Sequence, residues 1–176
     1  MKTREFIIEA IKRLLEKHTF ENITVQNIID EAGVSKPTFY RYFQSKYDLA
    51  ASVFSERISK NMLMQYDGSN YDEFQNMVFE IIKENRKYLR RVMKSSGPES
   101  FYEFLIKYIS ESYMQHGKER FGVVSFSEEQ LFKIDIVSGS WARCIKKWVD
   151  DDCKTPVDVL NIWMKDVTLT ADDMFR

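Results

Sequence analysis

The residues best suited to a chemical role lie in the stretch AGVSKPTFYRYFQSK, at positions 32–46. This stretch carries two tyrosines, two phenylalanines and three cationic residues, and it contains no aspartate or glutamate. Lysine, arginine, threonine and tyrosine side chains are well suited to bind the phosphates and base edges of nucleic acids, and the lack of acid avoids repulsion by the phosphate backbone. The composition therefore indicates a DNA-binding surface. The alternative is a solvent-exposed basic helix on a helical bundle.

Two short helices are expected to position these side chains. Thr24 and Ser35 have the residue type and the place of N-caps for helices at 25–32 and 36–42. Gly33 is placed to end the first of these helices in a left-handed conformation. Two short helices joined by such a turn form a helix-turn-helix, whose second helix lies in the DNA major groove.

The second helix must pack on the domain with one face and present the other face to DNA. Phe39 and Phe43 are four residues apart and form the expected buried stripe. The side chains left to face outward are Lys36, Thr38, Tyr40, Arg41 and Tyr42. Pro37 falls in the first helical turn, where its missing N–H costs little. Lys46 opens the next helix, whose free N–H groups favour an anion such as phosphate.

Nearly all of the remaining chain also has helical periodicity, so we predict an all-α fold of about nine helices. An amphipathic first helix is expected at 3–17, with Phe6, Ile7, Ala10, Ile11, Leu14 and Leu15 on its buried stripe. The other predicted helices lie at 46–64, 71–87, 88–95, 98–117, 127–149 and 156–175. We divide the chain into a DNA-binding domain at 1–50 and a helical regulatory and dimerisation domain at 51–176.

Composition excludes several other functions. The net charge is −1, so affinity for DNA must come from a local patch. No apolar run is long enough to span a membrane, so we expect a cytoplasmic protein that does not bind membranes. Cys144 and Cys153 do not form a C-x-x-C pair and are interpreted as reduced thiols in preference to a redox switch. No metal-binding, nucleophile or phosphate-loop motif occurs, so we predict no metal, no cofactor and no enzymatic activity.

The segment TVQNIIDEAGVSKPTFYRYFQSKYDL resembles the N-terminal DNA-binding domain of TetR-type transcriptional regulators. The resemblance implies an all-helical homodimer that reads a palindromic operator, in most members a repressor released by a small ligand. It implies that Thr24 and Gln26 meet phosphates or groove edges, that Ser35, Lys36, Pro37 and Thr38 lie at the groove floor, and that Tyr40, Tyr42 and Lys46 bind phosphates. Pro37 stands where many members have glycine or alanine.

The segment FKIDIVSGSWARCIKKWVDDDCKTPVDVLNIWMK resembles the last two helices of a Firmicutes-type TetR C-terminal domain, which implies a four-helix dimer interface. Two recognition helices about 34 Å apart are also needed to read a palindrome. Tryptophans are favourable interface anchors, and small residues allow close approach of helices. The candidate interface residues are Leu131, Ile134, Ser138, Trp141, Ile145, Trp148, Val159, Ile162 and Trp163. The alternative is that this stripe belongs to the core of a single chain.

A region rich in methionine and aromatic residues lies between the two ends. Such side chains line adaptable pockets, so they would suit an apolar or aromatic effector. The candidate pocket residues are Met62, Phe74, Met77, Met93, Phe101, Phe104 and Tyr108. Two alternatives stay open: these residues are ordinary bundle core, or the C-terminal half takes a protein co-activator in place of a small ligand.

Overall fold

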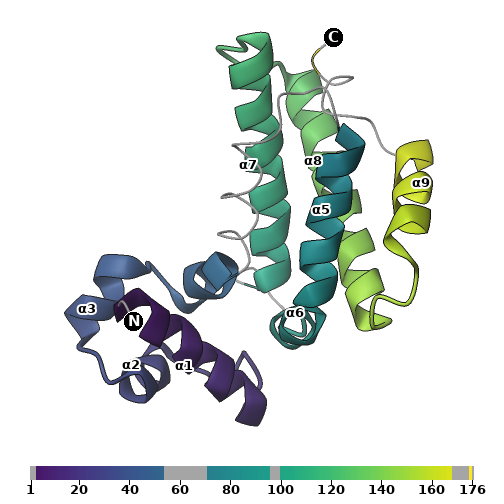
Figure 1. The fold of residues 1–176 in the computed structure, drawn as a ribbon. Helices are drawn as coiled ribbons and strands as arrows, with labels where there is room; N and C mark the ends of the chain where they lie inside the picture. Colours follow the sequence, from purple (N-terminus) through teal and green to yellow (C-terminus); the bar gives the residue numbers. More distant parts are fainter. Residues whose placement is uncertain (1–2, 54–70, 96–99, 168–174, 176) are drawn as a thin grey trace.

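The computed structural model of the chain describes residues 3–53, 71–95, 100–167 and 175. All regular structure in these ranges is helical, as predicted. The helices are α1 (Thr3–Lys17), α2 (Val25–Ala32), α3 (Lys36–Tyr42), α5 (Tyr71–Glu84), α6 (Arg86–Val92), α7 (Phe101–Phe121), α8 (Glu128–Asp150) and α9 (Val157–Val167). Residues 46–53 are also helical. Figure 1 shows α1, α2 and α3 as a small head at one end of a bundle that contains α5, α7 and α8.

The ends of the short helices in the head are set by local capping, as predicted. The Thr24 hydroxyl accepts from the backbone N–H of Asn27 at 3.1 Å, and the Asn27 side chain accepts in return from the Thr24 N–H at 2.9 Å. Ser35 Oγ accepts from the N–H of Thr38 at 3.3 Å. Gly33 has a φ of 65° and ends α2 in the left-handed region that glycine tolerates best.

The core of the head consists mainly of the predicted apolar side chains, although Leu14 of the predicted stripe is only half-buried. Phe39 and Phe43 are buried, and the first helix buries Ile7, Ala10, Ile11 and Leu15. Phe6 was expected on the same buried stripe, but its side chain is 46% exposed. It lies beside the turn between α2 and α3, where the helices leave a groove.

The end of α7 differs from the prediction. We expected the helix to stop at residue 117, but it continues to Phe121, and Gly122 caps it with a φ of 64°. Gly117 lies inside the helix and is buried, and a Cβ there would come within 2.7 Å of the Phe175 ring. This glycine therefore allows close packing and does not end the helix. In the C-terminal helix, the described part ends at Val167, and residues 168–174 of the predicted helix lie outside the described residues.

Aromatic contacts hold the bundle together. Phe79 on α5 stacks on Trp141 of α8, with ring centroids 5.7 Å apart, and meets the edge of Trp148 at 5.4 Å. The Trp148 Nε1–H donates to the Thr155 carbonyl at 2.9 Å, which fixes the turn after α8. Helix α9 packs on α5, and α7 runs antiparallel to α8. None of the described helices has the length and apolarity needed to cross a membrane.

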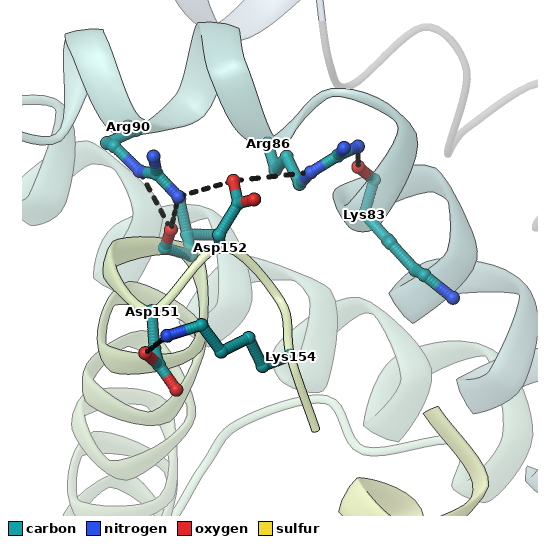
Figure 2. Close-up of polar contacts among 7 residues, drawn as sticks. Lys83, Arg86, Arg90, Asp151, Asp152 and Lys154 are labelled. Atoms are coloured by element: carbon teal, nitrogen blue, oxygen red, sulfur yellow. Dashed lines mark hydrogen bonds and ion pairs between the residues drawn. The ribbon is translucent and has the colours of Figure 1, made fainter. Parts of the chain in front are cut away.

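Helix α6 connects the head to the C-terminal end of α8. The Tyr88 hydroxyl donates to the Ala50 carbonyl at 3.0 Å, and burial raises the pKa of Tyr88 far above its usual range. Arg90 donates to the Val149 carbonyl at 3.1 and 2.9 Å and to the Asp152 carboxylate at 2.6 Å. Figure 2 shows Arg86 reaching the same carboxylate, at 3.4 Å. The predicted domain boundary at residues 50 and 51 falls within the helical stretch 46–53, and it stays a prediction.

Candidate DNA-binding surface

Helix α3 separates its buried and exposed side chains as its sequence predicts. Phe39 is fully buried, whereas Tyr40 is 48% and Tyr42 is 37% exposed. The Arg41 guanidinium lies over the Tyr42 ring at 5.1 Å from its centroid, an arrangement that stiffens both side chains. Lys36 in the first turn is exposed as well. The outward face of α3 thus combines cations with phenol hydroxyls, which are donors for phosphate oxygens.

Several of the other predicted DNA-contacting side chains already form local hydrogen bonds. The hydroxyls of Ser35 and Thr38 share a hydrogen bond of 2.8 Å, and the Thr24 hydroxyl donates to the Asn27 side chain at 2.7 Å. The Gln26 amide donates to the Asp30 carboxylate at 2.7 Å. The bonds of Thr24 and Ser35 fix the helix starts, and the Gln26 bond lies within α2. Their role at a groove edge stays a prediction.

Lys46 occupies a different environment from the one expected. Its ammonium donates to three backbone carbonyls, those of Phe20 at 3.0 Å, Glu21 at 3.1 Å and Ile23 at 2.8 Å. It also lies 4.9 Å from the centroid of the Phe20 ring and 5.3 Å from that of Tyr47. The three ammonium protons are therefore directed at the turn after α1. This geometry favours a structural role for Lys46 over the predicted phosphate contact.

The carboxylates of Glu31 and Asp48 each have a hydrogen-bond partner. The Glu31 carboxylate accepts from Arg13 Nε at 2.6 Å, and this hydrogen bond lowers the pKa of Glu31. The Asp48 carboxylate accepts from the Gln44 backbone N–H at 2.8 Å. Such pairing reduces the repulsion that free carboxylates would exert on phosphates.

A groove beside α3 was not anticipated. It has a volume of about 490 Å³ and is lined by Thr3, Phe6, Ala32, Gly33, Val34, Ser35, Thr38 and Arg41. It brings the start of α1 next to the first turns of α3. The sequence offered one weak signal for it: six apolar residues on α1 make a wider stripe than one buried face requires. Nothing in the sequence showed which edge of that stripe would be exposed.

Most of the predicted interface stripe on α8 faces the core of its own chain, the alternative left open by the sequence. Its buried members are Ile134, Ser138, Trp141, Ile145 and Trp148. Leu131, Ile162 and Trp163 are exposed instead, the last two by 60% and 57%, and Val159 is half-buried. Phe132 and Ile136 on α8 are exposed apolar residues that the periodicity argument missed.

The predicted pocket residues do not all line one space. Met93 and Phe101 are buried in the core, and Met77 is half-buried. Phe104 stacks between Phe101 and Tyr108, with centroid distances of 6.0 and 6.3 Å. Met62 lies outside the described residues, and the side chain of Phe74 is also outside them.

The two cysteines are free thiols. Cys144 is half-buried and Cys153 is buried, and burial raises the pKa of both, that of Cys153 to about 11. Raised pKa values make thiols poor nucleophiles at neutral pH. Within the described ranges, no group of three His, Cys, Asp or Glu side chains could hold a metal ion. The Asp152 carboxylate pairs with two arginines, Arg86 and Arg90.

Comparison with known proteins agrees with this geometry. Residues 7–53 match the family described as "Bacterial regulatory proteins, tetR family", and residues 69–166, more than half of the chain, match "Transcriptional regulator C-terminal region". Among curated relatives, the dhaKLM operon transcriptional activator DhaS of Lactococcus lactis is 26% identical over 93 residues, 51% of this chain and 48% of DhaS. The uncharacterised regulator YfiR of Bacillus subtilis is 20% identical over 154 residues, 88% of this chain and 69% of YfiR.

Solved structures show the same fold. The dihydroxyacetone kinase operon activator DhaS has a TM-score of 0.54 at 16% identity, over 94% of this chain and 93% of DhaS. The fatty acid degradation regulator FadR from Bacillus halodurans has a TM-score of 0.50 at 22% identity, over 99% and 95% of the two chains. The matched part spans about half the length of the curated DhaS sequence. From its helix-turn-helix and its family matches, the chain belongs to the TetR family of DNA-binding transcriptional regulators.

Proposed function

We propose that the chain is a homodimeric repressor that binds a palindromic operator through α3 and leaves it when a small-molecule effector binds. The observation that carries this proposal is the outward face of α3, with exposed Tyr40 and Tyr42 beside Arg41 and Lys36. Helix α3 is anchored by Phe39, which is fully buried in the head. A rigid helix with cations and hydroxyls on one face fits the major groove.

The side chains of α3 would have separate roles in DNA recognition. Lys36 and Arg41 supply charge against phosphates, and this part of the binding is independent of base sequence and sensitive to salt. Tyr40 and Tyr42 donate hydroxyls to phosphates from rings with few rotatable bonds. The Thr38 methyl group suits a thymine methyl, so it is the proposed source of base discrimination.

Dimerisation follows from the single recognition helix in each chain. A palindrome needs two such helices about one DNA turn apart. Exposed apolar side chains on the last two helices replace the buried stripe as the proposed interface: Leu131, Phe132 and Ile136 on α8, and Ile162 and Trp163 on α9. A Cβ at Gly139, three residues after Ile136, would meet nothing within 4 Å. This part of α8 is therefore open to close approach by a partner helix.

Effector control needs a ligand that binds one spacing of the two heads better than another. The α6 contacts described above supply a physical connection, because Tyr88 bonds to the head while Arg90 holds the end of α8. A shift of α8 would therefore displace α6, because Arg90 bonds the two helices together.

An activator that takes a protein partner is the second candidate. It is favoured by one observation, the relative DhaS, whose name describes an activator of the dhaKLM operon. The exposed residues Phe132 and Trp163 would then contact that partner in addition to a second copy of the chain.

Fluorescence anisotropy tests the proposal, with the purified protein and a duplex from upstream of its own coding sequence. A shuffled duplex is the control, and salt is stepped from about 50 to 200 mM. We expect tight binding of the native duplex by two chains, with a steep loss of affinity as salt rises. Lys36→Met should weaken binding, whereas Lys118→Met on the exposed side of α7 should not. Equal affinity for both duplexes would refute sequence-specific binding.

A further inference from the structure

Three buried polar side chains on α5 and α8 lack hydrogen-bond partners. Gln75 is 4%, Ser138 0% and Trp141 8% exposed. Among the described residues, no group pairs with Gln75 Nε2, Gln75 Oε1, Ser138 Oγ or Trp141 Nε1. Nearly all buried polar atoms in native proteins have a partner, because an unpaired one loses its hydration without compensation. Four unpaired atoms on facing helices therefore need an explanation.

The aromatic contacts between α5 and α8 bring these side chains to one level of the bundle. Phe79 touches Trp141, and Gln75 lies four residues earlier on the same face of α5. Ser138 lies three residues before Trp141, on the same side of α8. Because α5 and α8 run in the same direction (Figure 1), Gln75 and Ser138 lie toward the same end of the ring stack.

We propose that Gln75, Ser138 and Trp141 bind a small neutral molecule that carries both a hydrogen-bond acceptor and a donor, as a primary amide does. The Trp141 and Gln75 N–H groups would donate to its carbonyl oxygen. The Gln75 carbonyl and the Ser138 hydroxyl would accept from its N–H groups. Each of the four unpaired atoms then gains a partner, and the Phe79 ring offers an apolar wall.

The ligand is neutral because the described core offers it no counter-charge. The buried polar residues of the described chain are serines, Gln75 and Asn161, with no acidic or basic residue among them. A charged ligand would lose its hydration there without an ion partner. Asn161 donates to Asn76 between α9 and α5, a different face of α5 from that of Gln75. The proposed ligand is thus more polar than the apolar effector that the sequence suggested.

This site rests on the proposed function, since it is assigned as the place where the effector binds. Trp141 and Val149 belong to the same helix, and Val149 accepts from Arg90 on α6. A ligand that repositions Trp141 would move α8, which is bonded to α6 through Val149 and Arg90. Helix α6 in turn contacts the head through Tyr88.

Two-dimensional ¹H–¹⁵N NMR of the full chain tests the site without DNA. The chain has three tryptophans, so three indole N–H signals are expected, and Trp141→Phe assigns the one of interest. Acetamide and benzamide are the probes, each up to roughly 10 mM, the range for weak ligands. We expect the Trp141 signal to shift with at least one amide, and to shift further than the signal of Trp163, which lies on α9.

Control ligands and variants test whether the shift of the Trp141 signal depends on the amide group. Benzoate and toluene have nearly the shape of benzamide but lack its neutral amide, so they should leave the Trp141 signal unmoved. Gln75→Leu and, independently, Ser138→Ala should weaken amide binding by about tenfold or more, the loss expected for one hydrogen bond of about 1.4 kcal/mol. Gln115→Leu, at an exposed position on α7, should leave it unchanged.

The site is refuted if neither amide moves the Trp141 signal, if toluene moves it equally, or if both variants bind as the wild type does. Operator binding is measured separately by anisotropy. A protein that binds the amide and no operator would refute the proposed function and keep the site. A protein that binds its operator while the Trp141 signal ignores both amides would refute the site alone.

Discussion

Replacing Lys46 by methionine should destabilise the head rather than weaken a phosphate contact. Methionine keeps the apolar stem but removes the ammonium that donates to the carbonyls of Phe20, Glu21 and Ile23 at 2.8–3.1 Å. Hydrogen bonds to charged groups contribute about 1.5–3 kcal/mol each. Lys46 is only half-buried, so water can replace part of this stabilisation. We expect a loss of roughly 2–4 kcal/mol in the free energy of unfolding.

The loss should appear as a melting temperature lower by roughly 5–15 °C, since about 1 kcal/mol corresponds to about 2–4 °C for a chain of this size. Differential scanning calorimetry measures it. Lys36→Met is the matched control, because Lys36 is exposed in the first turn of α3. It should melt as the wild type does, while the slope of log affinity against log salt becomes shallower by about 1.8, because each of the two chains on the operator loses one phosphate contact worth about 0.9.

The opposite pattern would refute this assignment. If Lys46→Met melted with the wild type and lowered the salt slope as Lys36→Met is expected to do, Lys46 would be a phosphate ligand. The three carbonyl contacts would then be dispensable, and the role implied by the family resemblance would stand.

Three further variants test the bundle. Asp152→Asn removes the negative charge that pairs with Arg86 and Arg90, and it should lower the melting temperature at pH 7. Asparagine is chosen because it tolerates the left-handed backbone at position 152, where φ is 59°. Because Arg90 lowers the pKa of Asp152, the difference from the wild type should persist down to about pH 4 and vanish only as the wild-type carboxylate protonates below it. Trp148→Ala should cost about 3–5 kcal/mol of stability in denaturant melts by leaving a cavity beside Phe79, and an unchanged melt would contradict its core position. Trp163→Lys should shift sedimentation from dimer to monomer, whereas Val124→Lys, at a position that is also exposed to solvent, should not. A dimer that persists in both would exclude Trp163 from the interface.

Local signals explain why the helix-turn-helix could be predicted from the sequence. The caps at Thr24 and Ser35 bond to N–H groups three residues away, and Gly33 acts through its own backbone angle. Gly117 shows the limit of such signals. The sequence predicts a helix end at residue 117, but Gly117 packs closely against Phe175, which is 58 positions further along the chain, and the helix continues to Phe121.

Helical periodicity also could not distinguish burial in the core of one chain from burial in a dimer interface. The stripe through Trp141 and Trp148 is apolar in either case, because an intrachain core and a dimer interface select the same residue types. Trp141 and Trp148 contact Phe79 within the same chain, whereas Ile162 and Trp163 are exposed.

The sequence by itself determined the all-helical fold, the two short helices of the head and the outward face of α3, because these depend on residues about three or four positions apart. The tertiary structure alone showed that Lys46 meets backbone carbonyls, that Asp152 pairs with two arginines and that Gln75 is buried. Lys46 bonds to Ile23 at a separation of 23 residues, and Arg90 bonds to Asp152 at a separation of 62. Such contacts depend on how whole helices pack. The sequence alone therefore does not distinguish a charged or polar side chain that faces solvent from one that bonds to the backbone or to a ligand.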